Sequence, residues 1–384
     1  MRTPKAWGQP GPTPDGSHSQ LMKRGNIRAL STYLTQRGKR RIFQCRLCET
    51  TFSETRATVF FDLRTPAEKV MMTLTMLLVN VALTDSGFVV GVTEETGLAW
   101  LRRAAQQASA SKAHLRRELP VPPVQLAERW SCSRRTQGQQ AGPDGESTDR
   151  GEDGRPWVWS SFAPELRWMS AAVVGPRTRD TATAVVAAPK ARVAGIPACC
   201  SDGCTGALAA LIAAFHVVTT CARTGKRGRP RTPRCAPHPA LVYGPWVTQQ
   251  KQGTLLTLST RVVRGAERLT PLGFLSSTAL VARVHLPVPQ AWAPWARKTS
   301  SVCKDRERLR QRVVVFQAFS HVARPPMRVR RHLPLHARIR HGAICPRWQA
   351  RTPAMAAGVT EHVWTFRELL TAKFEPLDSQ SISG

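Results

Sequence analysis

Acidic side chains are scarce in this sequence, which has 25 Asp and Glu residues against 56 Lys and Arg among its 384 residues. The formal net charge is +31 at neutral pH when His is counted as neutral. An excess of this size favours a polyanionic partner, because each phosphate that meets a basic side chain releases condensed counterions. We therefore expect a nucleic-acid partner; the alternative is a basic surface that only keeps the chain in solution.

Long apolar runs are also missing. The longest, Val70 to Leu83, covers about 14 residues and is interrupted by Thr73, Thr75 and Asn80. A helix of this length is too short to cross a bilayer and suits a buried helix instead. The sequence begins with polar and Pro-rich residues, without the pattern of a targeting signal. We expect a cytoplasmic, nucleoid-associated chain with no membrane partner.

A complete set of zinc ligands is absent as well. The 10 cysteines are irregularly spaced, which does not suggest a disulfide framework. Only Cys45 and Cys48 have the spacing of metal ligands, and His18 is the one other obvious ligand before residue 64. A structural zinc needs four ligands, so these residues form half a site. The alternative is a knuckle-like turn that holds no metal.

The composition changes along the chain and divides it into five parts. A stretch rich in Gly, Asp, Glu and Gln at 138–154 has the composition of an exposed loop. The five parts are a Pro-, Gly- and Ser-rich disordered N-terminus at 1–25, a basic segment with short strands at 26–64, a helical module at 65–117, alternating strands and helices at 118–325, and a basic, Pro-interrupted tail at 326–384.

Two helical patterns between Thr84 and Ala108 are separated by a short turn at Gly91. Thr93 is placed to cap the second helix by accepting from a free backbone amide. Arg102 and Arg103 project away from the apolar face of that helix. This arrangement is typical of a helix-turn-helix, whose second helix enters the major groove of DNA. We assign Thr93, Arg102 and Arg103 to DNA binding; an ordinary helical hairpin is the alternative.

A second basic motif lies at Lys226, Arg227, Arg229 and Arg231. Gly allows its backbone to approach another molecule closely, and Pro keeps the segment out of a helix. Such an extended cationic segment can lay Arg side chains in a narrow A·T minor groove, and its core is similar to an AT-hook. We expect these four residues to contact DNA; a solvated basic loop is the alternative.

Several longer motifs follow in a fixed order: Arg40-Arg-Ile-Phe-Gln-Cys-Arg-Leu-Cys-Glu-Thr-Thr-Phe-Ser, Leu63-Arg-Thr-Pro-Ala-Glu-Lys-Val, Gln125-Leu-Ala-Glu-Arg-Trp, Trp157-Val-Trp, Ser201-Asp-Gly, Val313-Val-Val-Phe-Gln-Ala-Phe and Arg324-Pro. With the helix-turn-helix, they resemble bacterial insertion-sequence transposases over most of residues 25 to 325. The resemblance implies an incomplete zinc ribbon at 26–64, a helix-turn-helix at 65–117 and, at 118–325, a ribonuclease H-like domain with an Asp-Asp-Glu triad.

The fold that the resemblance implies is mixed α+β, with a ribonuclease H-like mixed sheet flanked by helices. Pro189 should kink or end the crossover helix, because it lacks an amide donor and clashes with the preceding turn. The implied elements are a first strand at 124–131, hairpin partners at 157–162 and 169–174, a crossover helix at 178–193, a further strand at 196–201 and a closing helix at 300–323.

The chemistry of this family is a phosphoryl transfer helped by two divalent metals, with Mg²⁺ expected, held by carboxylates. Carried over by motif, the three acid positions fall at Ala127, Asp202 and Ala282. Only Asp202 is retained, and one carboxylate does not hold two hard cations. Glu128 is not a substitute, because neighbouring strand residues face opposite ways. The Mg²⁺ site that the family would have is therefore incomplete, and we assign no cofactor with certainty.

Our favoured hypothesis is a catalytically inactive transposase relative that binds DNA through 65–117, with a homo-oligomer on DNA ends as a further possibility. Two alternatives remain open, namely an active transposase that uses other acids and a decaying product without a function. Cys199, Cys200 and Cys221 stand where the resemblance leads us to expect large aromatic side chains. Lost aromatic volume costs several kcal/mol per site, on the order of a domain's total stability.

Overall fold

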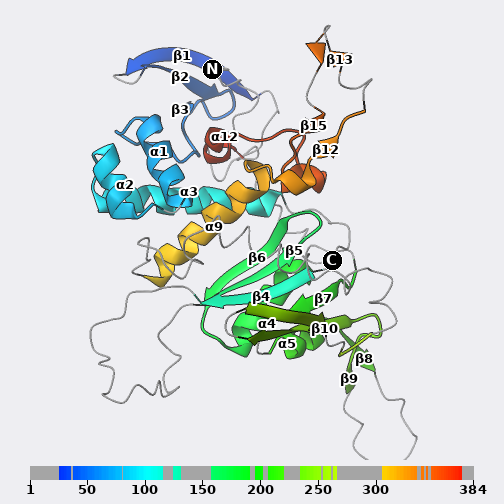
Figure 1. Ribbon diagram of the computed structural model, residues 1–384. Helices are drawn as coiled ribbons and strands as arrows, with labels where there is room; N and C mark the ends of the chain where they lie inside the picture. The colour runs from blue at the N-terminus through cyan, green and yellow to red at the C-terminus, as the bar shows by residue number, and fades with distance from the viewer. Residues whose placement is uncertain are drawn as a thin grey trace, which may run out of the picture. The chain divides into compact units, whose positions relative to one another are not determined.

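A computed structural model describes a mixed α+β protein that forms two compact units (Figure 1). The helical unit comprises residues from 1–116, 311–325 and 359–384, and the sheet unit comprises residues from 117–310 and 326–358. The residues that the structure describes are 26–35, 38–79, 81–115, 124–130, 157–190, 195–201, 206–219, 234–251, 254–260, 263–265, 305–334, 339–340, 343–344 and 347–373.

The helical unit begins with a small antiparallel sheet in the order β1-β2-β3. Its strands are β1 (Ile27–Thr35), β2 (Gly38–Cys45) and β3 (Thr51–Ser53). One face buries Ile27, Phe43, Cys45 and Phe52, which pack together as a small core. The remaining positions of β1 are exposed or half-buried, so the core of this sheet comes mostly from β2 and β3.

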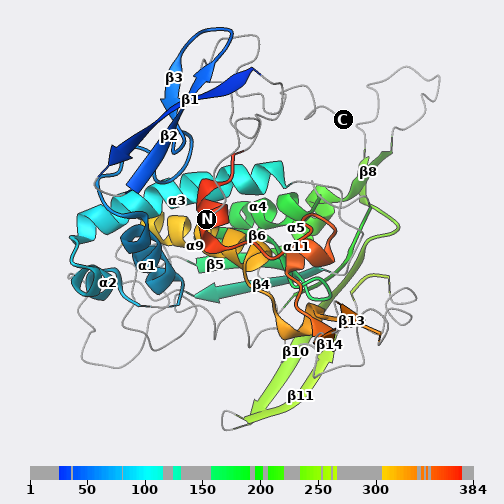
Figure 2. The same cartoon turned by 90° about the horizontal axis from the view of Figure 1, so that it is seen from above.

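Among the described residues, five helices build the rest of this unit: α1 (Ala67–Leu78), α2 (Leu83–Val90), α3 (Glu94–His114), the part of α9 (Arg306–Val322) from residue 311 onward, and α12 (Phe366–Thr371). Figures 1 and 2 show α9 crossing the long α3, with α1 and α2 near the start of α3. Leu74 and Leu77 of α1 and Trp100 and Leu101 of α3 are buried. None of the described helices is long and apolar enough to span a bilayer.

Polar side chains join the helices of this unit across long stretches of sequence. The buried Arg312 of α9 donates to the carbonyl oxygen of Leu77 at 2.7 Å. Lys112 of α3 donates to the side-chain oxygen of Gln317 at 2.7 Å. These bonds supply partners for polar groups on buried helix faces, where an unpaired group would cost about 1–3 kcal/mol. They therefore fix α9 against α1 and α3.

The C-terminal helix α12 also belongs to the helical unit. Its capping box is formed by Thr365 and Glu368, each of which satisfies an amide of the first turn. Arg367 forms an ion pair with Glu68 of α1 at 2.8 Å. The side chain of Gln107 on α3 donates to the carbonyl oxygen of Ala372. The segment that we expected to be a tail thus contains a helix held by α1 and α3.

The sheet unit is built on a six-stranded mixed sheet in the order β11-β10-β7-β4-β5-β6. Strands β4, β5 and β6 pair antiparallel, β7 and β10 run parallel to β4, and β11 is antiparallel to β10. The strands are β4 (Val124–Trp130), β5 (Trp157–Ala163), β6 (Trp168–Gly175), β7 (Ala198–Ser201), β10 (Val242–Lys251) and β11 (Thr254–Thr260).

Two helices, α4 (Arg179–Lys190) and α5 (Ala207–Ala214), cover one face of this sheet (Figure 1). The core between them contains Leu126, Trp159, Val185 and Leu211. The smaller elements of the unit are β8 (His216–Thr219), β9 (Arg234–Pro237), η4 (Met327–Val329), β12 (Arg331–His332), β13 (Ile339–Arg340), β14 (Ala343–Ile344), β15 (Trp348–Gln349) and α11 (Pro353–Ala356).

The expected mixed α+β class is confirmed, and each strand and helix implied for the sheet is present within a few residues of its expected bounds. The crossover helix α4 ends at Lys190, one residue beyond Pro189. The helix expected at 300–323 begins at Arg306, and from residue 311 it belongs to the helical unit. Long-range side-chain bonds decide that placement, and no local pattern reveals them.

We predict that Gly87→Ala destabilises the protein by about 1–3 kcal/mol, because a Cβ on Gly87 would lie 2.6 Å from the carbonyl oxygen of Val92. The matched control is Gly97→Ala, whose Cβ would lie 2.8 Å from the flexible end of the Leu83 side chain and in ordinary contact with Thr73 at 3.7 Å. Urea denaturation followed by far-ultraviolet circular dichroism measures both. Equal stability of the two variants would contradict a close approach between α2 and the following turn.

Candidate nucleic-acid interface

Helices α2 and α3 are joined by a tight turn at residues 91–93. Gly91 ends α2 in the left-handed conformation, with φ of 71°, which glycine adopts without steric cost. The amide of Val92 then donates to the carbonyl oxygen of Gly87 at 2.9 Å. Thr93 starts α3 by accepting from the amide of Thr96 at 3.3 Å. The cap expected at Thr93 is therefore present, and its hydroxyl has a structural partner.

The two arginines assigned to DNA binding differ in their surroundings. Arg102 is exposed on the side of α3 opposite the buried Trp100 and Leu101. Arg103 is half-buried, and its guanidinium donates to the carbonyl oxygen of Phe61. Arg102 thus offers its charge to solvent, whereas Arg103 holds the segment that precedes α1. The exposed Glu95 in the first turn of α3 would repel phosphate near that end.

The cysteine pair lies at the end of β2 and in the turn that follows it. Cys45 is buried against Phe43 and Phe52, whereas Cys48 is exposed. Within the described residues there is no group of three or more His, Cys, Asp or Glu that could hold a metal. Cys45 therefore has a packing role besides any role as a ligand.

We predict substoichiometric zinc in the purified protein, because Cys45 and Cys48 supply two of the four ligands that a structural site needs. Elemental analysis of protein purified without chelator measures this content. Cys48→Ser is the informative variant, since Cys48 is exposed and its loss leaves the core of the small sheet unchanged. One tightly bound zinc per chain that disappears in Cys48→Ser would show that distant residues complete the site.

The first acid position of the resemblance, Ala127, lies on β4, the strand that joins the antiparallel and parallel parts of the sheet. The register pairs Ala127 with Ser160 of β5 and Leu126 with Ser201, the last residue of β7. Glu128 pairs with Trp159 in the same register. Asp202 and Ala282 lie outside the described residues.

The two cysteines before Asp202 are packing residues. Cys199 belongs to the core that contains Trp159 and Tyr243, and Cys200 is also buried. Burial raises the pKa of the Cys199 thiol to about 12, and burial beside Cys199 also raises the pKa of Cys200. Both thiols are therefore protonated at neutral pH and unsuited to act as nucleophiles or metal ligands.

The basic motif at Lys226, Arg227, Arg229 and Arg231 lies outside the described residues, and its contact with the minor groove stays a prediction. The structure adds a cationic surface that we did not identify from the sequence, at the antiparallel pair of strands β12 and β15. The Arg330 guanidinium lies 4.2 Å from the ring centroid of Trp348, and His332 meets the same ring edge-on at 5.0 Å.

Arg347 donates to the imidazole of His332 at 3.0 Å and completes this exposed cluster. An aromatic ring among cations is a surface on which nucleic-acid bases can stack and phosphates can bind. The sequence does contain a signal for it, because no Asp or Glu occurs from 308 to 360. The separation of Arg330 and Trp348 in sequence conceals their contact.

A comparison with protein-family models finds no match to this chain, and none of the curated proteins compared with it is similar.

Proposed function

We propose that this chain is a DNA-binding relative of insertion-sequence transposases whose catalytic centre is lost. The single observation that carries the proposal is the turn that joins α2 to α3, with a buried inner face and Arg102 exposed on the outer one. A short turn between two helices and a basic outer face on the second helix support a helix-turn-helix whose second helix enters the major groove. The net charge of +31 supports a polyanionic partner.

The sheet unit supports the same family resemblance through its connections. Strand β4 has β5 and β6 as hairpin partners, and α4 leads to β7, which pairs parallel with β4. The sequence motifs implied this order of elements for a ribonuclease H-like domain. The proposal that the sheet is ribonuclease H-like rests on that agreement.

Loss of catalysis follows from the chemistry of the first acid position. Two Mg²⁺ ions need several oxygen ligands, and Ala127 has none to offer from the central strand. Its neighbour Glu128 is the next position along the strand, and we do not propose it as a substitute because successive strand positions alternate between the two faces of a sheet. The residues present do not fit a two-metal centre, and we propose no metal-dependent step. DNA binding without strand transfer is the function that these residues support.

We predict that Arg102→Ala weakens duplex DNA binding about equally for all sequences and flattens the plot of log K against log salt by about one unit. One phosphate contact per exposed arginine accounts for that change. The matched control is Arg179→Ala, which removes the same charge from an exposed position on α4. Fluorescence anisotropy at several salt concentrations measures both slopes. An unchanged slope in Arg102→Ala would show that this face of α3 does not contact DNA.

We also predict that the purified protein neither nicks nor joins DNA ends in Mg²⁺ or Mn²⁺, because two of the three acid positions hold alanine. Asp202→Ala should behave like the unmodified chain in this assay. Cleavage of a supercoiled plasmid, with a chelator as control, provides the measurement. Metal-dependent cleavage that disappears in Asp202→Ala would instead favour an active transposase that uses other acids.

A further inference from the structure

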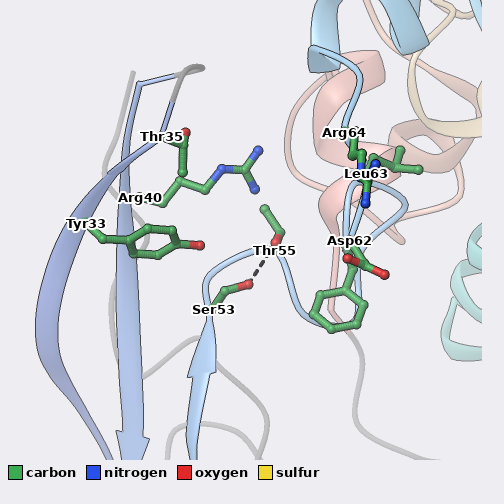
Figure 3. Close-up of a pocket in the computed structure, with 9 residues that line it drawn as sticks. Tyr33, Thr35, Arg40, Ser53, Thr55, Asp62, Leu63 and Arg64 are labelled. Carbon is green, nitrogen blue, oxygen red and sulfur yellow. Dashed lines mark hydrogen bonds between the residues drawn. The ribbon is translucent and has the colours of Figure 1, made fainter.

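A cavity of about 420 Å³ opens in the helical unit between the small sheet and the segment that precedes α1. Its walls include Tyr33 of β1, Arg40 of β2, and Thr55, Phe61 and Arg64 of the segment between β3 and α1 (Figure 3). A volume of this size is within the range, roughly 300–1,000 Å³, of small-molecule sites. The cavity lies apart from the α2–α3 turn, and neither the resemblance nor the proposed function assigns it a role.

Two arginines, Arg40 and Arg64, and one carboxylate, Asp62, are the charged residues that line the cavity. Figure 3 shows the Arg40 guanidinium extending from β2 into the space between the sheet and the opposite segment. Arg40 is half-buried, and neither Arg40 nor Arg64 forms an ion pair or hydrogen bond with another described residue. Guanidinium groups without a carboxylate partner favour a phosphate, which they can bind through paired hydrogen bonds.

Aromatic rings and hydroxyls form the remaining walls. Tyr33 and Phe61 line the cavity and are 38% and 45% exposed, so both rings have surface available to a ligand. Ser53 and Thr55 also line the cavity and share a hydrogen bond of 2.9 Å (Figure 3). A planar base stacks favourably on such rings, and hydroxyls bind sugar or phosphate oxygens. A ligand that carries both a phosphate and a planar base is a nucleotide.

The segment opposite the sheet is held in a fixed conformation. Asp62, which also lines the cavity, has φ of 52°, and Ala57 has φ of 58°. Side chains other than glycine adopt this left-handed region at a cost, and they remain there where surrounding contacts hold them. The contacts here are the Thr58 hydroxyl bond to the carbonyl oxygen of Thr55 at 2.6 Å and the Arg103 bond to the carbonyl oxygen of Phe61. The cavity is therefore preformed.

We propose that this cavity binds one nucleotide unit, with its phosphate on Arg40 and Arg64 and its base against Phe61 and Tyr33. Asp62 lies among the lining residues as an acceptor for an exocyclic amino group of the base. The unit has two sources with the same chemistry, an unpaired nucleotide at the end of a DNA strand and a free mononucleotide. The strand-end source rests on the proposed DNA binding, whereas binding of a free mononucleotide does not.

The experiment compares three ligands on the full chain: a blunt duplex, the same duplex with a short single-stranded overhang, and a deoxynucleoside monophosphate. For a strand-end nucleotide, the overhang should improve affinity roughly tenfold over the blunt duplex, the gain that stacking of one base on an aromatic ring provides. Arg40→Ala and Phe61→Ala should each bring the ratio of the two affinities close to one. Phe61→Ala keeps the backbone carbonyl that Arg103 contacts.

Matched variants separate this site from general charge effects and from misfolding. Lys39→Ala removes an exposed charge beside Arg40 that does not line the cavity, and should leave the ratio unchanged. Arg102→Ala should weaken both duplexes equally. Arg40→Lys keeps the charge without the paired donors and should retain part of the ratio. A thermal melt of each variant identifies any loss of folding.

Each outcome decides the proposal. An overhang preference lost in Arg40→Ala and kept in Lys39→Ala supports the strand-end source. Monophosphate binding lost in the same variant, without an overhang preference, supports the free nucleotide and holds even if duplex binding fails. No overhang preference together with no monophosphate binding overturns the proposal, as does a well-folded Arg40→Ala that matches Lys39→Ala.

Discussion

Burial of one face of α3 is the constraint on which the helical unit depends. Trp100 and Leu101 are almost fully inaccessible, and each stabilises the folded state by roughly 1.5–3 kcal/mol through burial. The same helix is bound to α9 through Lys112 and Gln317. Because the helical period is fixed, burying these residues leaves Arg102 on the outer side. The candidate DNA-binding face is thus a consequence of core packing rather than of a local preference.

In the sheet unit, the pairing of β4 with β7 is the constraint that positions the first acid position. The register that aligns Leu126 with Ser201 places Ala127 next along β4, where the resemblance expects the first carboxylate. A one-residue shift of the strand that brought Glu128 to that position would turn every side chain to the other face and expose the buried Leu126, so we do not propose Glu128 as a replacement. The backbone arrangement of the sheet is consistent with its proposed ancestry, while this position has no metal ligand.

Residues with strong local signals were predictable from the sequence. The motif at 125–130, through the resemblance, implied a first strand at 124–131 where β4 lies, and the cap at Thr93 predicted the start of α3. Helix α12 was missed although Thr365 and Glu368 have the spacing of a capping box, because a basic composition suggested a tail. The capping box was a correct local signal, but we gave more weight to the basic composition of the segment.

Contacts between distant residues were not predictable in the same way. The partnered position of Arg103 depends on where Phe61 lies, which no pattern in α3 reveals. The cavity around Arg40 joins residues from both sides of β3, so its chemistry emerges only after folding. Long-range packing, and not propensity, decides these features.

The central claim is that the positive charge of this chain faces DNA, and the salt dependence of duplex binding tests it most directly. The account predicts that log K falls linearly with log salt, with a slope of several units, because multiple phosphate contacts release counterions. Anisotropy titrations of the full chain with one duplex over a range of salt concentrations give that slope. Binding that does not change with salt, or no binding at low salt, would contradict the claim.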